Sequence, residues 1–564
     1  MRGLGGTPGE RALFIGLAAV VAALSLAPLL RLLLEGVAPG GRFGLGVLQS
    51  VLTAPRTWLA AGHTLATALT STAISLVLGT AMALLVEATD IRGKPAFAFA
   101  FLLPLMIPSQ VTAIAWIDLL GPTSPLLKTL GLAPPLGSPH PLYGYGGISF
   151  LMGVEHAPLV FLALGAGLRA LPGELIEAAE SSGAGPLRVV LTVVLPMARP
   201  ALVAGAALAF VSALGNFGTP ALLGIPAGYS VLTVLIYQQL AGFGPQVIAE
   251  VAALSLLLGA IAAAGVALQT AASRRRDVRA ARPPTVRLVP LRRWRPVFAV
   301  LAWAAVAALV AMPLLALLAT ALVRAYGLPL NADTITAENF RYILLEHAAT
   351  ARAALNSLFL AAATAVTTAA ASVLLGYVVV WRDGRLARML SLAAEIPYAL
   401  PGVVLALAMI LVFLRPLPLL HVTLYGTLAI ILVAYVVRFL VLALRTTIAG
   451  FLQLHGSLEE AARILGAGLW RRIVTVILPL AGPAVAAGAV LVFLTALNEL
   501  AVSTLLWSTG NETLGVVVFS LEQGGDGTSA AALSVLTALA TIALMGLASL
   551  AARRLPRGVL PWQA

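Results

Sequence analysis

The sequence contains no cysteine, which excludes disulfide bonds, thiolate metal sites and cysteine nucleophiles. Lysine is nearly absent as well, and neither Lys94 nor Lys128 lies in a Gly-x-x-x-x-Gly-Lys-Ser/Thr phosphate loop. The 6 histidines show no metal-ligand spacing with one another or with an acidic residue on one helix face. No nucleophile and base are arranged for catalysis either. We therefore expect no catalytic residue, no metal and no cofactor in this chain.

Charged residues are also scarce, and long apolar runs take their place. Only 10% of the 564 residues are charged and 60% are hydrophobic, whereas charged residues make up about 25% of a typical soluble domain. Because a membrane-spanning helix needs about 20 apolar residues, we predict twelve spans: 12–34, 64–86, 97–117, 147–168, 200–222, 247–270, 297–323, 356–381, 390–414, 423–445, 484–507 and 530–551. The predicted fold is all-α, a polytopic membrane protein with about 12 transmembrane helices, since helices satisfy their own backbone groups in lipid.

The remaining positive charges are concentrated between particular spans. Nine arginines lie between spans six and seven, and others follow spans two, eight and twelve. Basic residues favour the cytoplasmic side, so we expect these segments and both termini to be cytoplasmic. Arg31, Arg42 and Arg56 oppose this orientation weakly. Orientation and contact with acidic membrane lipid explain the basic segment, and nucleic acid is not an expected partner.

One polar stretch occurs twice, which indicates an internal duplication. Four pairs of landmarks share a spacing of 283 positions: Glu177 and Glu460, Gly183 and Gly466, Pro196 and Pro479, Pro200 and Pro483. Three earlier pairs share a spacing of 293 positions: His63 and Asn356, Pro104 and Pro397, Pro108 and Pro401. We predict a first half over 1–270, a basic cytoplasmic linker over 271–296 and a second half over 297–564. Spans one and seven show no clear similarity to each other.

The repeated stretch has the features of a rigid loop on the cytoplasmic side. Glu-Ala-Ala favours a helix start, because alanine has high helix propensity and acidic residues suit the helix N-terminus. A glycine then interrupts or caps that helix, and Leu-Pro precedes the next apolar run. We expect two short helices joined at a glycine corner, in loops of about 170–200 and 453–483.

This pattern resembles the EAA loop of ABC-importer permeases, which has Glu-Ala-Ala, a glycine six residues after the glutamate, and Leu-Pro further on. In that family the loop forms a coupling helix that docks into an ATP-binding subunit. The resemblance assigns ATPase coupling to Glu177, Ala178, Ala179, Gly183, Glu460, Ala461, Ala462 and Gly466. An ordinary amphipathic surface helix is the alternative, and the presence of two copies argues against it.

Polar residues inside the apolar spans are candidates for the translocation path, because charge in a membrane span is costly. Asn498 and Glu499 lie about fifteen residues into span eleven, and Asn216 is the counterpart of Glu499 in span five. We predict that these three residues line the path, with hydrogen bonding between helices as the alternative. Glu395 and Arg438 are expected to form an ion pair, whereas Glu155 has no evident basic partner.

The whole chain resembles a fused type I ABC-importer permease with two halves. The runs Tyr435-Val436-Val437-Arg438-Phe439 and Leu497-Asn498-Glu499-Leu500 are most similar to the ferric-iron importer permeases of bacteria. The resemblance implies two copies of an ATPase subunit that binds ATP-Mg, an extracytoplasmic substrate-binding protein, and a multi-pass location in the bacterial inner membrane. Thiamine, polyamine or phosphonate are alternative substrates. A 12-span ion-coupled secondary transporter and a gated channel are alternatives of another class, but neither explains the paired loops.

Overall fold

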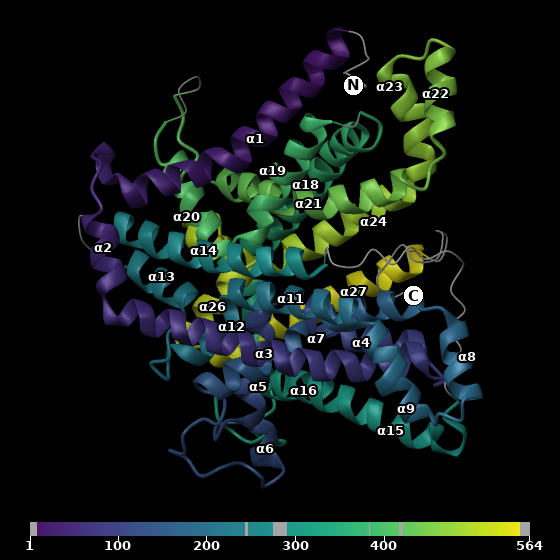
Figure 1. Ribbon diagram of the computed structural model, residues 1–564. Helices are drawn as coiled ribbons and strands as arrows, with labels where there is room; N and C mark the ends of the chain where they lie inside the picture. Colours follow the sequence, from purple (N-terminus) through teal and green to yellow (C-terminus); the bar gives the residue numbers. More distant parts are fainter. Residues whose placement is uncertain (1–7, 243–245, 274–289, 383, 417–420, 553–564) are drawn as a thin grey trace.

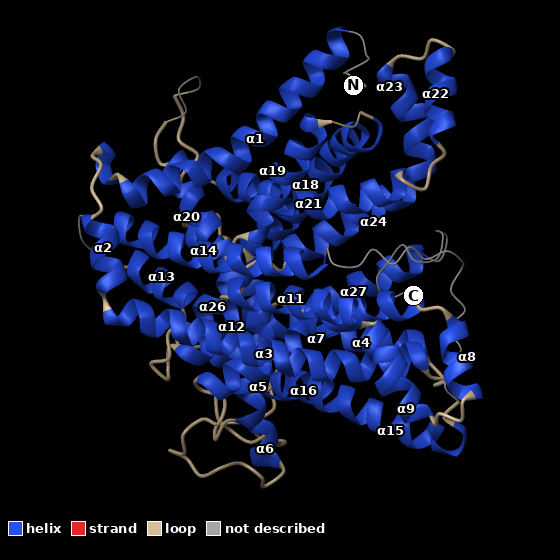
Figure 2. Ribbon diagram, viewed as in Figure 1, coloured by secondary structure: helices blue, strands red, loops and turns tan. Residues whose placement is uncertain are grey.

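The computed structural model describes residues 8–242, 246–273, 290–382, 384–416 and 421–552 (Figure 1). Within these ranges the protein consists of helices and loops, with no β-strand (Figure 2). Nine of the described helices are long and apolar enough to cross a membrane, and three further pairs would each cross as a bent span, giving up to 12. The predicted all-α, polytopic fold is therefore confirmed.

The helices of the two halves repeat in order and in length. Those of the first half are α1 (Pro8–Val37), α2 (Gly46–Thr53), α3 (Pro55–Ala88), α4 (Lys94–Met106), α5 (Ser109–Leu120), α6 (Pro125–Thr129), α7 (Tyr145–Arg169), α8 (Gly173–Ser181), α9 (Pro186–Val189), α10 (Leu195–Met197), α11 (Arg199–Gly215), α12 (Gly218–Gly224), α13 (Leu232–Leu240) and α14 (Val247–Ser273). Those of the second half are α15 (Arg295–Val306), α16 (Met312–Ala321), α17 (Glu338–Arg341), α18 (Ala348–Trp381), α19 (Arg385–Ala399), α20 (Gly402–Phe413), α21 (Leu428–Phe451), α22 (Gly456–Ile464), α23 (Leu469–Arg472), α24 (Leu478–Leu497), α25 (Ser503–Leu506), α26 (Leu514–Gln523) and α27 (Gly527–Ala552). Helices α3 and α5 match α18 and α20 after a shift of 293 residues, and α8 and α9 match α22 and α23 after a shift of 283.

The third and ninth predicted spans are sharply broken rather than continuous. Helices α4 and α5 meet at 99°, and α19 and α20 meet at 109°. Pro108 and Pro401 stand at the starts of α5 and α20, and Ile107 and Leu400 before them are extended, with ψ of 138° and 143°. Proline supplies no N–H for a continuing helix and disfavours helical backbone in the residue before it. Each bend therefore turns the chain through roughly a right angle at the second proline of its pair.

The first helix of each half packs against the opposite half. α1 lies against α14 of its own half and against α19 and α20 of the second half. α15 and α16 lie against α4 and α5 of the first half, and α16 also packs on α27. Because α14, α19 and α20 are the counterparts of α27, α4 and α5, the two exchanges are equivalent. Spans one and seven are therefore related by position in the fold, although their sequences show no clear similarity.

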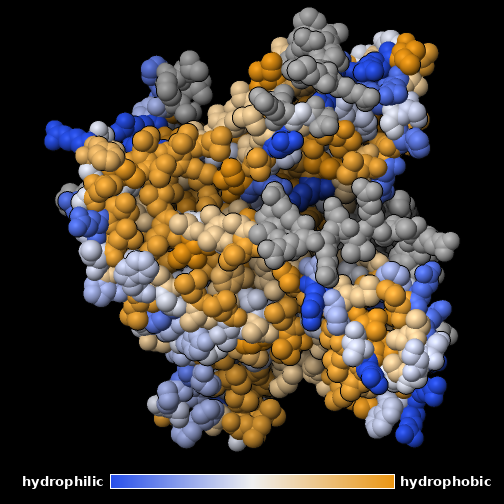
Figure 3. Space-filling view, in the orientation of Figure 1, coloured by the Kyte–Doolittle hydropathy of each residue, from blue (hydrophilic) through white to orange (hydrophobic). Residues whose placement is uncertain are grey.

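The buried core crosses the boundary between the halves. One apolar cluster contains Ile114, Leu223, Leu407 and Val518, which come from α5, α12, α20 and α26. On the surface, apolar side chains cover the middle of the face seen in Figure 3, and hydrophilic ones gather near α8, α9, α22 and α23. This distribution suits a protein whose apolar middle lies in lipid and whose predicted coupling loops lie in water.

Candidate functional site

The two predicted coupling loops have the same fold. Each contains a short helix, α8 or α22, then a tight corner, then a second short helix, α9 or α23, and a π-helical turn at Val190–Val194 or Ile473–Ile477. Helices α8 and α22 lie on the same side of the molecule, where α1 begins and α27 ends (Figure 1). The two loops therefore form a pair of separate projections on one face.

A glycine with left-handed backbone forms each corner. The φ angle is +81° at Gly183 and +79° at Gly466. The amide of Ala184 donates to the carbonyl of Ala179 at 3.1 Å, and the equivalent bond in the second loop has the same length. This is the Schellman arrangement, which satisfies the last carbonyls of a helix and favours glycine because it has no Cβ. The predicted glycine corners are confirmed.

The remaining predicted coupling residues lie at the surface of the two projections. Glu177, Ala178, Glu460 and Ala461 are exposed, and Ala179 and Ala462 are half-buried. Large apolar side chains project beside them: Ile464, Leu465 and Trp470 are 83%, 86% and 72% exposed, and Leu187 is 72% exposed. Exposed apolar groups that cluster in this way are typical of a contact with another protein or with a membrane.

The predicted path residues lie at breaks between helices, not in the middle of continuous spans. Asn216 follows the end of α11, and Asn498 and Glu499 follow the end of α24, which corrects the predicted extents of spans five and eleven. The Asn216 side chain accepts a hydrogen bond from the Thr219 amide at 3.3 Å. The Glu499 carboxylate accepts one from the Val502 amide at 2.9 Å. A side chain that binds a backbone amide three residues further on competes with the helical hydrogen bonds and favours a break at that point.

Each break is tied to one position on a neighbouring long helix. Asn216 Nδ2 donates to Glu155 Oε2 of α7 at 2.9 Å. In the second half Arg438 Nε of α21 lies 3.8 Å from Glu499 Oε2. Glu155 and Arg438 are 283 positions apart, as are Asn216 and Glu499. The halves use the same two positions, but the acid lies on the long helix in the first half and at the break in the second.

One predicted ion pair is wrong. Arg438 pairs with Glu499, whereas Glu395 pairs with Arg445, whose Nη2 lies 3.2 Å from its Oε1. Arg445 lies about two helical turns beyond Arg438, so both arginines share one face of α21. The position of each arginine along α21 therefore decides which acid it pairs with. Glu155 has no basic partner among the described residues; Thr219 Oγ1, at 2.7 Å, binds it together with the amide of Asn216.

The breaks of the two halves meet near the centre of the molecule. Asn498 Nδ2 donates to the carbonyl of Met106 at 2.7 Å, next to the break between α4 and α5. Gln110 of α5 is 1% exposed, and neither atom of its amide has a partner within the described part of the chain. Glycines at Gly218 and Gly515 leave room for it, because a Cβ at either would lie about 3 Å from Gln110 atoms. The centre therefore contains a buried polar site made by both halves.

The family model described as "Binding-protein-dependent transport system inner membrane component" matches residues 75–278 and 369–560. The chain belongs to this family of ABC-importer permeases. A probable ABC transporter permease protein of Sinorhizobium fredii is 26% identical over 82% of this chain and 80% of its own length. A ferric transport system permease protein of Actinobacillus pleuropneumoniae is 24% identical over 80% of this chain and 65% of its length. A putative 2-aminoethylphosphonate transport system permease protein of Salmonella choleraesuis is 29% identical over 35% of this chain.

Sequence analysis of this permease missed three residues of the central site. Glu155 and Arg438 were considered separately, although the 283-residue spacing already relates them. Gln110 was not considered, although it stands two residues after Pro108. A search for polar residues at matched positions of both halves finds the first two, and only the packing of the breaks finds the third.

Proposed function

We propose that this permease imports ferric iron, which an extracytoplasmic binding protein delivers and which ATP hydrolysis by partner subunits drives across the bacterial inner membrane. The observation that supports iron is the similarity to ferric transport permeases across both halves, at 24–25% identity over 75–80% of this chain. Similarity to a 2-aminoethylphosphonate permease suggests that phosphonate as a second candidate substrate, but this similarity covers 35% of the chain. The family match sets aside a secondary transporter.

In this proposal two copies of an ATPase subunit, each with ATP-Mg, bind α8 and α22. The exposed Glu-Ala-Ala surfaces, the neighbouring apolar side chains and the rigid glycine corners support docking into grooves of a partner. Each projection reaches a long helix within one loop, so movement of the partner would be transmitted to α11 and α24. Both termini and the linker 271–296 are then cytoplasmic; residues 274–289 of that linker lie outside the described structure.

The proposed path runs past the central breaks, where Asn216, Asn498 and Glu499 gather. A broken helix exposes backbone amides and carbonyls that a continuous helix would hide, and such breaks are tolerated in membranes where they line a cavity or are buried in protein. Glu499 and Arg438 balance each other in the present arrangement. Separation of the halves would expose both groups to a passing solute.

Uptake tests the substrate directly. The permease is expressed with the ATPase and binding-protein genes beside its own in cells that lack ferric importers, and uptake of radioactive ferric iron is measured. We expect uptake that requires ATP and is lost with Gly466→Val, and that 2-aminoethylphosphonate, thiamine and polyamines do not reduce. Uptake of radioactive 2-aminoethylphosphonate in the absence of iron uptake would overturn the proposal in favour of the phosphonate.

A further inference from the structure

The two coupling helices are held in place by different chemistry. Beneath α22, Glu459 is 6% exposed and accepts a hydrogen bond from the Tyr377 hydroxyl at 2.7 Å. Arg472 Nη1 of α23 lies 3.3 Å from the same oxygen of Glu459. The second coupling helix is thus fastened to α18 and α23 by a buried carboxylate.

Apolar residues stand at the matching places of the first half. The counterparts of Tyr377, Glu459 and Arg472, by the spacings of 293, 283 and 283 residues, are Leu84, Ile176 and Val189. Ile176 and Val189 are buried in one apolar cluster, and Leu84 packs against it. At these three matched positions the first half has apolar packing, whereas the second half has a charged network.

The charged network reaches the N-terminal helix. Glu10 Oε1 of α1 lies 2.9 Å from Arg472 Nη2, and Glu10 Oε2 lies 2.7 Å from Arg382 Nη2 at the end of α18. The Arg472 and Arg382 side chains are only 3% and 9% exposed. Glu10 is the member of this network that α1 contributes, and it contacts both arginines.

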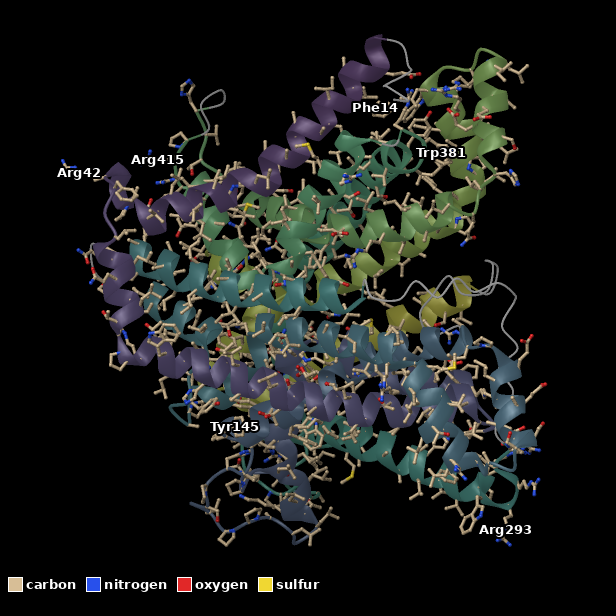
Figure 4. The ribbon with its side chains drawn as sticks, in the orientation of Figure 1. Phe14, Arg42, Tyr145, Arg293, Trp381 and Arg415 are labelled. Atoms are coloured by element: carbon tan, nitrogen blue, oxygen red, sulfur yellow. The ribbon has the colours of Figure 1, made fainter. Side chains whose placement is uncertain are left out.

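Aromatic packing holds α1 at the same place. Phe14 of α1 is buried and stacks on Tyr377 at 5.9 Å between ring centroids, and Trp381 lies beside Tyr377 at 5.4 Å. Figure 4 labels Phe14 of α1 and Trp381 of α18 close to each other. Glu10 lies at the start of α1, which crosses to the opposite side of the molecule. The network therefore connects α22 to a membrane-spanning helix.

The anchor of the other exchanged helix is built differently. Arg295, at the start of α15, pairs with Asp90 in the segment between α3 and α4, and Asp90 also accepts from the Leu291 amide at 2.8 Å. Asp90 lies in the segment that follows α3 and not in the coupling helix α8. Ion pairs thus fasten both exchanged helices, and the pair made by Glu10 continues, through Arg472, into the coupling helix α22.

We propose that Glu10 is a positioning residue for the second coupling helix, so that α1 sets the position of α22 and not that of α8. The two ATPase subunits would then be coupled to unequal projections. This inference rests on the coupling role proposed above for α8 and α22. Removal of Glu10 takes an acid away from two buried arginines, and removing a partner of a buried charge is costly.

Spin labels test this in the permease alone. Ile464 and Ser181 are exposed residues 283 positions apart, at the ends of α22 and α8. Each is replaced by cysteine in the otherwise cysteine-free chain, labelled, and measured by electron paramagnetic resonance in lipid nanodiscs. With Glu10→Gln we expect loss of the immobilised component at position 464 and an unchanged spectrum at 181. Glu10→Asp should retain the immobilised component.

Two further variants keep the test decisive. Asp90→Asn, which breaks the other anchor, should leave position 464 unchanged. In the combined variant Tyr377→Leu, Glu459→Ile, Arg472→Val, which carries the apolar set of the first half, Glu10→Gln should no longer affect position 464. An unchanged label at 464 in Glu10→Gln, or equal changes at 464 and 181, would overturn the proposal. Neither readout depends on which solute the permease imports.

Discussion

Replacement of Glu499 by alanine should destabilise the permease as well as impair transport. The side chains of Glu499 and Arg438 are 11% and 14% exposed, so the change leaves a buried arginine without its acid. Breaking a buried pair costs about 3–5 kcal/mol. The lower end applies, because Arg438 Nη1 keeps its hydrogen bond to the Leu400 carbonyl at 3.2 Å.

The same change removes a hydrogen bond to the backbone. Glu499 accepts the amide of Val502, just before α25, at 2.9 Å, and a typical hydrogen bond contributes about 1 kcal/mol. The sum, about 4 kcal/mol, is a large part of the roughly 5–15 kcal/mol that stabilises a typical folded protein. We expect less Glu499→Ala protein in the membrane and a lower melting temperature in detergent.

The first half supplies a repair. The combined variant Arg438→Glu, Glu499→Asn, Val502→Thr introduces the groups that Glu155, Asn216 and Thr219 provide in the first half. Since that set satisfies itself without a basic residue, we expect it to restore the amount of protein and most of the melting temperature. If this stable combined variant still transports less than the unmodified permease, the loss is due to the missing charges and not to misfolding.

The assay is size-exclusion chromatography and thermal unfolding in detergent, with Glu395→Ala as the matched control. Glu395 and Arg445 form a more exposed pair, and exposed pairs contribute about 0–1 kcal/mol. A Glu499→Ala protein as stable as the Glu395→Ala protein would refute the assignment of a buried pair. A combined variant less stable than Glu499→Ala would refute the equivalence of the two breaks.

Three further predictions concern orientation, coupling and packing. A cysteine at Ser273 should not react with an impermeant reagent added to intact cells, and reaction would reverse the proposed topology. Gly183→Val and Gly466→Val should insert normally but lose ATPase subunits on co-purification, because left-handed backbone costs about 1–2 kcal/mol for a residue with a Cβ; full retention in both would contradict a coupling role. Gly79→Ala should lower the melting temperature, because its Cβ would meet the Ala157 carbonyl at 2.5 Å and overpacking costs about 1–3 kcal/mol, whereas Gly62→Ala in the same helix, with nothing within 4 Å, should not.

The sequence was sufficient to predict the repeated architecture because its signals are local. Apolar length marks the spans, and the pairs Gly183 with Gly466 and Pro108 with Pro401 mark equivalent corners and breaks. The glycine corners have the backbone that their sequence demands, since left-handed φ is cheap only without a Cβ. The Glu-Ala-Ala surfaces themselves were predicted from a resemblance and not from periodicity.

The central site could not be predicted in the same way, because it depends on contacts between distant segments. An apolar run has the same hydrophobic pattern whether its helix continues or ends within the run. The ends of α11 and α24 were therefore not predicted. The partner of Arg438 depends on rotation of α21 against two other segments, and Glu395 lies nearer in the chain than Glu499. Gln110 becomes notable only once Gly218 and Gly515 lie beside it.

The exchange of the first helices has a consequence for biogenesis. During synthesis α1 enters the membrane long before α19 and α20 exist, so the face that packs on them must wait for more than half of the chain. Contacts between segments so distant in sequence form late and slowly. We expect α1 to remain loosely placed, and open to quality-control proteases, until α19 and α20 have been inserted, so that a late part of the chain fixes the position of the first helix.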